Sequence, residues 1–186
     1  MGKIRYSMNV SLDGYIEDPD GAFDFAAPAD DVHRAANDQV RRASALLMGR
    51  RMYEVLDEFW TAAATRDDLP EVMAEFAQVY VATPRVVFSD TLDRVPDGVR
   101  LVRSRNAVAE VTRLKRETDG ELGVGGPGLA ASLVDLIDEF ELYVMPVLVG
   151  GGKPYLATRD KLRLRLAEHR LFASGAMYLR YERDAS

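Results

Sequence analysis

The chain has 186 residues, of which 47% are hydrophobic, and it carries 30 acidic against 24 basic side chains, a net charge of −6. This size suits one domain spanning residues 1–186, and the acidic balance excludes a general attraction to nucleic acid or to an anionic membrane surface. There is no cysteine, and the two histidines lie far apart, so we expect neither disulfides nor a metal site.

The chain shows no targeting or spanning segment. Its first residues lack the apolar region of a secretory signal, and no apolar run approaches the ~20 residues that cross a membrane. We therefore expect a cytoplasmic protein without a membrane partner.

The first third alternates short apolar runs with helical periodicity. Residues 4–10 predict a strand that leaves the core through the turn at Asp13-Gly14. Apolar residues then follow helical spacing from Asp30, the expected N-cap, to about Ser44. The apolar run 45–48 predicts a short buried strand, and helical spacing returns over 51–59.

The middle of the chain continues this alternation. Its patterns predict a helix over 70–80, strands over 85–89 and 99–102, and a helix that Asn106 caps and that ends by Gly120. A glycine cluster at 125–128 then opens a further helix that bears Leu129, Leu133, Leu136 and Ile137.

The last third changes character. Residues 141–149 are apolar apart from Glu141, whereas 162–166 and 176–182 alternate between apolar and polar side chains, as antiparallel strands do. The whole order predicts an α/β fold: a three-layer α/β/α sandwich with a mostly parallel central sheet that antiparallel C-terminal strands extend.

Two glycine-bearing strand ends are candidate anion sites. Glycines in 125–128 allow backbone N–H groups to surround a ligand, although Gly-Gly-Pro-Gly is also ordinary turn chemistry. Arg50 and Arg51 follow Gly49 at a helix start, where the helix dipole disfavours cations unless an anion lies nearby. Solvated surface arginines are the alternative interpretation.

Other polar residues have two interpretations each. Asp13 could orient a substrate or relay a proton, or it could be a turn residue that its own backbone satisfies. Ser89 could bind a ribose or phosphate, or it could be an ordinary turn residue. The glycines 150–152 indicate a close approach of backbone to a ligand or to another strand. We expect His33 and His169 to be structural or exposed.

A set of motifs in chain order carries a resemblance. Together they resemble the dihydrofolate-reductase-like superfamily, and above all the reductase domain of the riboflavin-biosynthesis deaminase-reductase, over nearly the whole chain. The motifs are Ser11-Leu-Asp-Gly14, Leu47-Met-Gly-Arg50, Val87-Phe-Ser89, Val124-Gly-Gly126 and Pro146-Val-Leu-Val-Gly150.

The resemblance implies an NADPH-dependent reductase, with NADH not excluded, that transfers hydride to a small heterocyclic substrate at a CH–OH or CH–NH type of group. The phosphoribosylamino-uracil of riboflavin biosynthesis is one such substrate. A non-catalytic nucleotide-binding protein and a dihydrofolate reductase are the alternatives. The resemblance also implies a homodimer.

The resemblance assigns residues to each ligand. The substrate would meet the catalytic residue Asp13 together with Ser11, Tyr15 and Asp30. The cofactor would lie against Gly49, Arg50, Arg51, Ser89, Gly125, Gly126, Gly128 and Leu129. Asp90 stands where relatives carry a basic residue, so NADPH preference would depend on Arg50 and Arg51.

Overall fold

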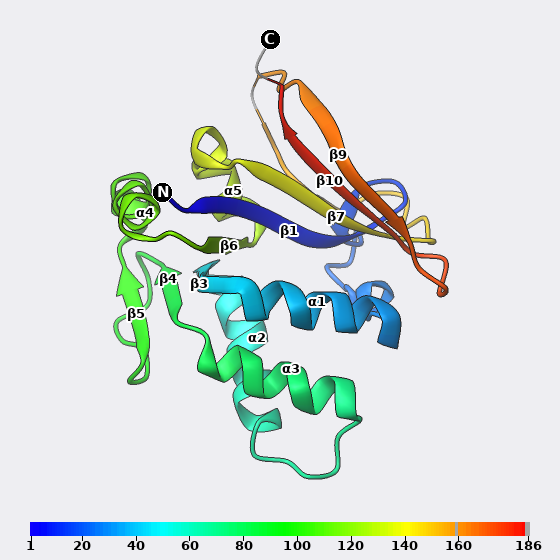
Figure 1. Ribbon diagram of the computed structural model, residues 1–186, viewed down its shortest axis with the longest axis horizontal. Coiled ribbons are helices and arrows are strands. Elements are labelled where there is room, and N and C mark those ends of the chain that lie inside the picture. Colours follow the sequence, from blue (N-terminus) through cyan, green and yellow to red (C-terminus); the bar gives the residue numbers. More distant parts are fainter. Residues whose placement is uncertain (159, 185–186) are drawn as a thin grey trace.

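The computed structural model describes residues 1–158 and 160–184, and its centre is an eight-stranded sheet with the order β5-β4-β3-β6-β1-β7-β10-β9 (Figure 1). Neighbours among the first six strands are parallel, and β10 runs antiparallel to both β7 and β9. The predicted mostly parallel sheet with antiparallel C-terminal strands is thus confirmed. The strands are β1 (Lys3–Ser11), β3 (Ala43–Gly49), β4 (Arg85–Phe88), β5 (Val99–Val102), β6 (Glu121–Gly125), β7 (Glu139–Met145), β9 (Leu164–Leu171) and β10 (Met177–Arg183).

Helices cover both faces of this sheet, as predicted. On one face lie α1 (Asp30–Arg42), α2 (Arg50–Ala63) and α3 (Glu71–Ala82), and on the other lie α4 (Ala107–Glu117) and the short α5 (Pro127–Ser132) (Figure 1). Three single-turn 3₁₀ helices occur at Asp24–Ala26, Ser104–Asn106 and Val134–Leu136. In the described part of the chain, no helix is long and apolar enough to cross a membrane.

Strand β3 shows how one apolar run serves two cores. Successive side chains of a strand point to opposite faces, so Leu47 packs with the core beneath α4 and α5, while Met48 packs with Tyr53 and Tyr80 of α2 and α3. Both side chains are almost fully buried. The uninterrupted apolar run 45–48 follows from this burial on both faces.

Several helix boundaries differ from the predictions. The N-cap of α1 is Ala29, so Asp30 is the first helical residue and forms no side-chain cap. Asn106 is the N-cap of α4, but its side chain likewise makes no capping hydrogen bond. Helix α5 ends at Ser132, because Leu133 leaves helical geometry at φ −108°, and the chain continues as a 3₁₀ turn instead of a helix to Ile137.

The late strands also differ. Strand β7 begins at the buried Glu139 and ends at Met145, so 146–149 is a loop, and β9 covers 164–171 where alternation predicted 162–166. A strand that contains buried acidic residues lacks the apolar pattern by which strands are predicted. The cations that neutralise these residues come from elsewhere in the chain. Glu139 lies beside Arg5 in the register of β1 and β7.

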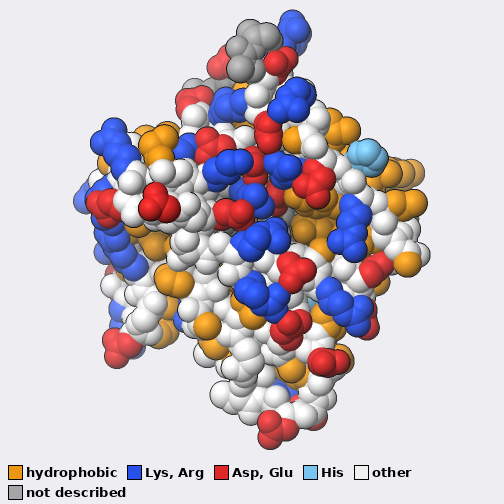
Figure 2. All heavy atoms as spheres, in the orientation of Figure 1, with side chains coloured by type: hydrophobic (Ala, Val, Ile, Leu, Met, Phe, Trp, Pro, Cys, Tyr) orange, Lys and Arg blue, Asp and Glu red, His pale blue; other side chains and the backbone are white. Residues whose placement is uncertain are grey.

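One face of the β1, β7 and β10 region is polar. In register across these strands, Arg5 lies beside Glu139, and Ser7 lies beside Glu141, which lies beside Arg180. Figure 2 shows acidic and basic side chains interleaved over the middle of this face. Helix α1 flanks this face, and Gln39 of α1 hydrogen-bonds to Ser7 and Glu141, while most of the charged side chains pair with one another.

Candidate functional site

The carboxyl ends of the parallel strands meet at one edge of the sheet. Gly49 at the end of β3 pairs with Phe88 of β4, Met48 pairs with Gly125 at the end of β6, and Ser11 at the end of β1 pairs with Met145 of β7. Ligands of open parallel sheets bind at this edge.

The two glycine loops pack against each other. A Cβ added at Gly125 would lie 3.2 Å from Cγ of Met52, and one added at Gly49 would lie 3.8 Å from Cβ of Leu129. Gly126 has φ +95°, a conformation that favours glycine, whereas a Cβ at Gly128 would meet nothing within 4 Å. The structure therefore places the two predicted anion sites next to each other.

Arg50 and Arg51 begin α2, and both face solvent. Arg50 Nη1 lies 3.3 Å from Glu54 Oε1, and Arg51 Nη2 lies 3.2 Å from Glu17 Oε2. Both arginine side chains are more than half exposed, so these ion pairs are weak and an anion could replace either carboxylate.

Ser89 is buried and stabilises the turn that it begins. Its Oγ accepts hydrogen bonds from the N–H groups of Thr91 (3.1 Å) and Leu92 (3.0 Å), as one of its two predicted interpretations requires. Asp90 Oδ1 accepts a hydrogen bond from the N–H of Ser104 at 3.0 Å, which offsets part of its charge at this edge.

Arg103 is a residue that sequence reasoning missed. It directly follows β5, and its Nη1 donates to the carbonyl oxygen of Leu92 at 2.8 Å, so its guanidinium lies over the turn that begins at Ser89. The sequence signal was present: a cation directly after a predicted strand, in the same relation that Arg50 has to β3.

Asp13 fastens one loop to another. Its carboxylate accepts hydrogen bonds from the N–H groups of Val149 (3.2 Å) and Gly150 (2.8 Å). Hydrogen bonds from Ser11 and from these two N–H groups hold the pKa of Asp13 below its ordinary value. Asp13 is therefore ionised at neutral pH, where it accepts hydrogen bonds and has no proton to donate.

Ser11 and Tyr15 belong to the same turn. The buried Ser11 accepts a hydrogen bond at Oγ from the N–H of Tyr15 at 3.0 Å. Tyr15 begins β2 (Tyr15–Glu17), which pairs with β8 (Lys153–Pro154). The structure thus brings Ser11, Asp13 and Tyr15 together at the end of β1.

The second glycine cluster approaches a strand. Gly150, Gly151 and Gly152 all have positive φ, and a Cβ added at Gly152 would overlap the carbonyl oxygen of Glu17 and lie 2.6 Å from the carbonyl carbon of Asp18. Of the two predicted reasons for this cluster, backbone packing against another strand is the one that the structure supports.

Asp30 lies apart from these residues. Its side chain is exposed, with Arg34 Nη2 at 4.0 Å, and it shares no hydrogen bond or ion pair with Ser11, Asp13 or Tyr15 in residues 1–158 and 160–184. The neighbouring Asp31 instead accepts a hydrogen bond from the N–H of Ser174 in the β9–β10 turn.

This chain is similar in sequence to known proteins over nearly its whole length. The model of the RibD C-terminal domain family matches residues 2–178. An uncharacterised protein of Bacillus subtilis (strain 168), YyaP, is 26% identical over 183 residues, which are 96% of this chain and 94% of that protein.

Two solved structures share the fold. A candidate riboflavin biosynthesis protein from Shewanella sp. PV-4 is 25% identical, with a TM-score of 0.71 and 99% of each chain covered. Dihydrofolate reductase from Enterococcus faecalis, solved with NADP(H), is 14% identical, with a TM-score of 0.65, 98% of this chain and 97% of that one covered. The second likeness concerns the fold alone.

Proposed function

Because this chain belongs to the RibD C-terminal domain family, a family of reductase domains, we propose that it is an NADPH-dependent reductase of a small heterocyclic substrate. One observation carries the proposal. The glycine-bearing ends of β3 and β6 lie side by side and continue into Arg50 and Arg51, at the sheet edge where such folds bind ligands.

The residues at this edge fit a dinucleotide. Gly128 is exposed and a Cβ there would meet nothing within 4 Å, while Gly125 and Gly126 pack against Met52, and Gly49 is the N-cap of a 14-residue helix whose first N–H groups have no side-chain cap. These residues, with Leu129 and Ser89, would hold the cofactor, which would supply the hydride. The E. faecalis dihydrofolate reductase, which shares the fold, was solved with NADP(H).

A preference for NADPH over NADH needs cations for the extra phosphate. Arg50 and Arg51 provide two, and Arg103 adds a third beside the Ser89 turn. Asp90, which would repel this phosphate, is bound to the N–H of Ser104. We therefore infer that the three arginines outweigh Asp90.

The substrate side of the site is the turn at the end of β1. Ser11 and Asp13 fix the positions of Tyr15 and of the 146–152 loop, which would hold the acceptor ring near the cofactor and limit water. A ring bearing a carbonyl or an imine would suit such a pocket. The phosphoribosylamino-uracil of riboflavin biosynthesis is the first substrate to assay, and dihydrofolate is the second.

The test is the affinity of the purified protein for each cofactor, read from quenching of Trp60 and tyrosine fluorescence. We expect NADPH to bind at least ~10-fold more tightly than NADH, which is about 1.4 kcal/mol. Equal affinities would contradict the NADPH preference, and no binding of either would overturn the reductase proposal. Binding without turnover on any substrate would favour a non-catalytic nucleotide-binding protein.

We also propose that two copies pair through an apolar patch on the C-terminal hairpin. Leu171 pairs with Met177 and Leu166 pairs with Tyr181, so these side chains share one face of β9 and β10. Leu171 is 71% exposed, and Leu166 and Met177 are also exposed. Light scattering should give a dimer for the native chain and a monomer for Leu171→Asp.

A further inference from the structure

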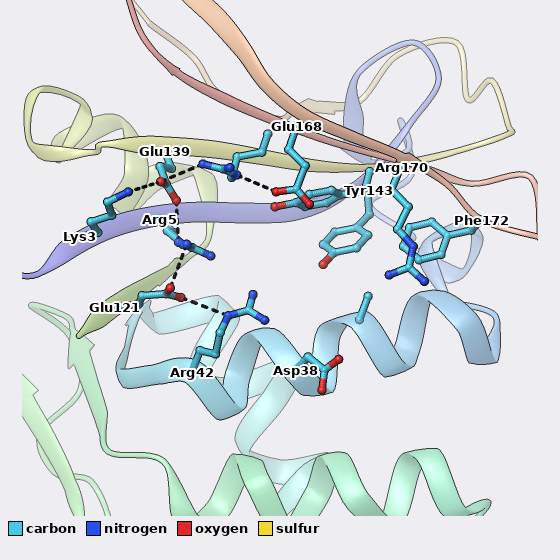
Figure 3. A pocket seen from close by; sticks show the side chains of 13 residues that line it. Lys3, Arg5, Asp38, Arg42, Glu121, Glu139, Tyr143, Glu168, Arg170 and Phe172 are labelled. Atoms are coloured by element: carbon cyan, nitrogen blue, oxygen red, sulfur yellow. Dashed lines mark hydrogen bonds and ion pairs between the residues drawn. The ribbon is translucent and has the colours of Figure 1, made fainter.

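A charged hollow of about 460 Å³ is lined by none of the residues proposed above to bind the cofactor or the substrate. It opens between α1 and the polar face of the sheet, and Lys3, Arg5, Glu121 and Glu139 in its wall stand at the amino ends of their strands. Figure 3 shows Arg42 rising into it from α1, and Arg170 and Phe172 reaching into it from the opposite side. Tyr143, Arg170 and Phe172 lie toward the carboxyl ends of β7 and β9, so the hollow extends along the sheet from its amino edge.

Most charges in the hollow neutralise one another. Arg5 pairs with Glu121 and Glu139, and Arg180 pairs with Glu139 and Glu168. Asp38, which also lines the hollow, lies 2.6 Å from Arg41. The acidic side chains of the wall are therefore largely occupied by cations of the protein itself.

Arg170 is not neutralised in this way, and Arg42 is only partly neutralised. Arg170 forms no ion pair with any residue that the structure describes, and its guanidinium lies 4.7 Å from the centre of the Phe172 ring. Stacking uses the face of a guanidinium and leaves its N–H edge free to bind an acceptor. Arg42 is half exposed and has only Glu121 nearby, at 3.7 Å.

A phenol hydroxyl faces the same space. Tyr143 is 5% exposed, yet its hydroxyl makes no hydrogen bond within residues 1–158 and 160–184, whereas the hydroxyl of its neighbour Tyr178 donates to Glu141 at 2.8 Å. Figure 3 shows the Tyr143 ring pointing into the hollow. Burial and the charge of Glu141 raise the pKa of Tyr143, and the charges of Arg42 and Arg170 oppose this rise.

We propose that this hollow binds a small phosphate monoester through Arg42, Arg170 and the hydroxyl of Tyr143. The two arginines match the two negative charges of a phosphate monoester, and the hydroxyl supplies a third donor. Phe172 and Tyr178 form an aromatic wall for the group that the phosphate carries. The hollow is large enough for more than a free phosphate ion.

The test is calorimetry with phenyl phosphate and with inorganic phosphate at constant ionic strength. We expect both probes to bind, with phenyl phosphate tighter because its ring packs on the aromatic wall. Arg170→Met should weaken binding by at least ~10-fold, and Tyr143→Phe, which keeps the ring, by ~5-fold. Arg165→Met is the matched control, because Arg165 is also on β9 but pairs with Glu182 and does not line the hollow.

A second control separates this hollow from the proposed cofactor loops, which also favour phosphate. Arg50→Met should leave binding in the hollow unchanged. The proposal fails if neither probe binds, if Arg165→Met weakens binding as much as Arg170→Met does, or if Arg50→Met abolishes binding while Arg170→Met does not. Because the cofactor loops are tested by NADPH affinity, failure of one proposal leaves the other intact.

Discussion

The carboxylate of Asp13 accepts a hydrogen bond from the N–H of Gly150 at 2.8 Å, which fastens the end of β1 to the loop after β7. A proton donor needs a proton at working pH, and this carboxylate is held ionised. The bond therefore favours a positioning role over proton transfer for Asp13.

We first predict that Asp13→Ala loosens the 146–152 loop and lowers kcat/KM, while Asp13→Asn, whose amide oxygen can replace one of the two carboxylate acceptors, retains more activity than Asp13→Ala. Hydrogen exchange of the Val149 and Gly150 amides should rise in Asp13→Ala. Equal loss in both variants, without faster exchange, would instead indicate that the carboxylate itself takes part in chemistry.

The direction of the pKa shift of Asp13 predicts how its hydrogen bond to Gly150 depends on pH. A carboxylate with a lowered pKa stabilises the folded form above its unfolded pKa, near 4, and loses that contribution as pH falls through the folded value. Protection of the Gly150 amide should therefore persist from neutral pH down to about pH 4 and disappear only in stronger acid. Loss of protection already between pH 7 and 5 would contradict the lowered pKa.

Gly152→Ala should destabilise the fold much more than Gly98→Ala. Both glycines have positive φ, but a Cβ at Gly152 would meet the backbone of Glu17 and Asp18, whereas one at Gly98 would meet nothing within 4 Å. The conformational cost alone is about 1–2 kcal/mol, so we expect Gly152→Ala to lose at least ~2 kcal/mol more. Urea unfolding of both variants measures the difference.

The buried Glu141 should weaken the fold as pH rises. Burial raises its pKa, although a hydrogen bond from Tyr178 opposes this. An acid with a raised pKa contributes stability that is complete below its unfolded pKa, near 4.5, and is lost as pH rises through the folded value. Urea unfolding should therefore show the native chain losing stability relative to Glu141→Gln from about pH 4.5 upward. Glu168→Gln, at an exposed position on β9, is the control.

Arg103→Met should weaken NADPH and spare NADH. A charged hydrogen bond to a phosphate contributes about 1.5–3 kcal/mol, so we expect a rise of ~10-fold or more in the Kd for NADPH. Arg105→Met, two residues further on and exposed, should change neither affinity. If Arg103→Met lowers the affinities for both cofactors equally, Arg103 stabilises the turn and does not bind the extra phosphate of NADPH.

The sequence predicted the order of elements well because that order depends on local pattern. The apolar run 45–48 and the helical spacing after Gly49 appear in the structure as β3 and α2. The convergence of Gly49 and Gly125 also follows from topology, because parallel strands end at one edge.

Features that depend on distant partners could not be predicted. Glu139 and Glu141 look like surface residues until Arg5 and Arg180 are placed beside them. Asp30 has the residue type of an N-cap, yet the backbone of Ala29 takes that position, and Asp31 binds a turn more than 140 residues away. The second glycine cluster was visible, but only the path of β2 shows what it approaches.

The central place of β1 sets the order in which this sheet can assemble. This first strand is bordered by β6 and β7, whose paired residues are 121–124 and 139–145. A nascent chain that has not reached these residues therefore leaves both edges of β1 without partners and Ile4 and Tyr6 without their core. Closure of such long loops is slow, so the amino-terminal strand must stay free of wrong pairings until most of the chain has been synthesised.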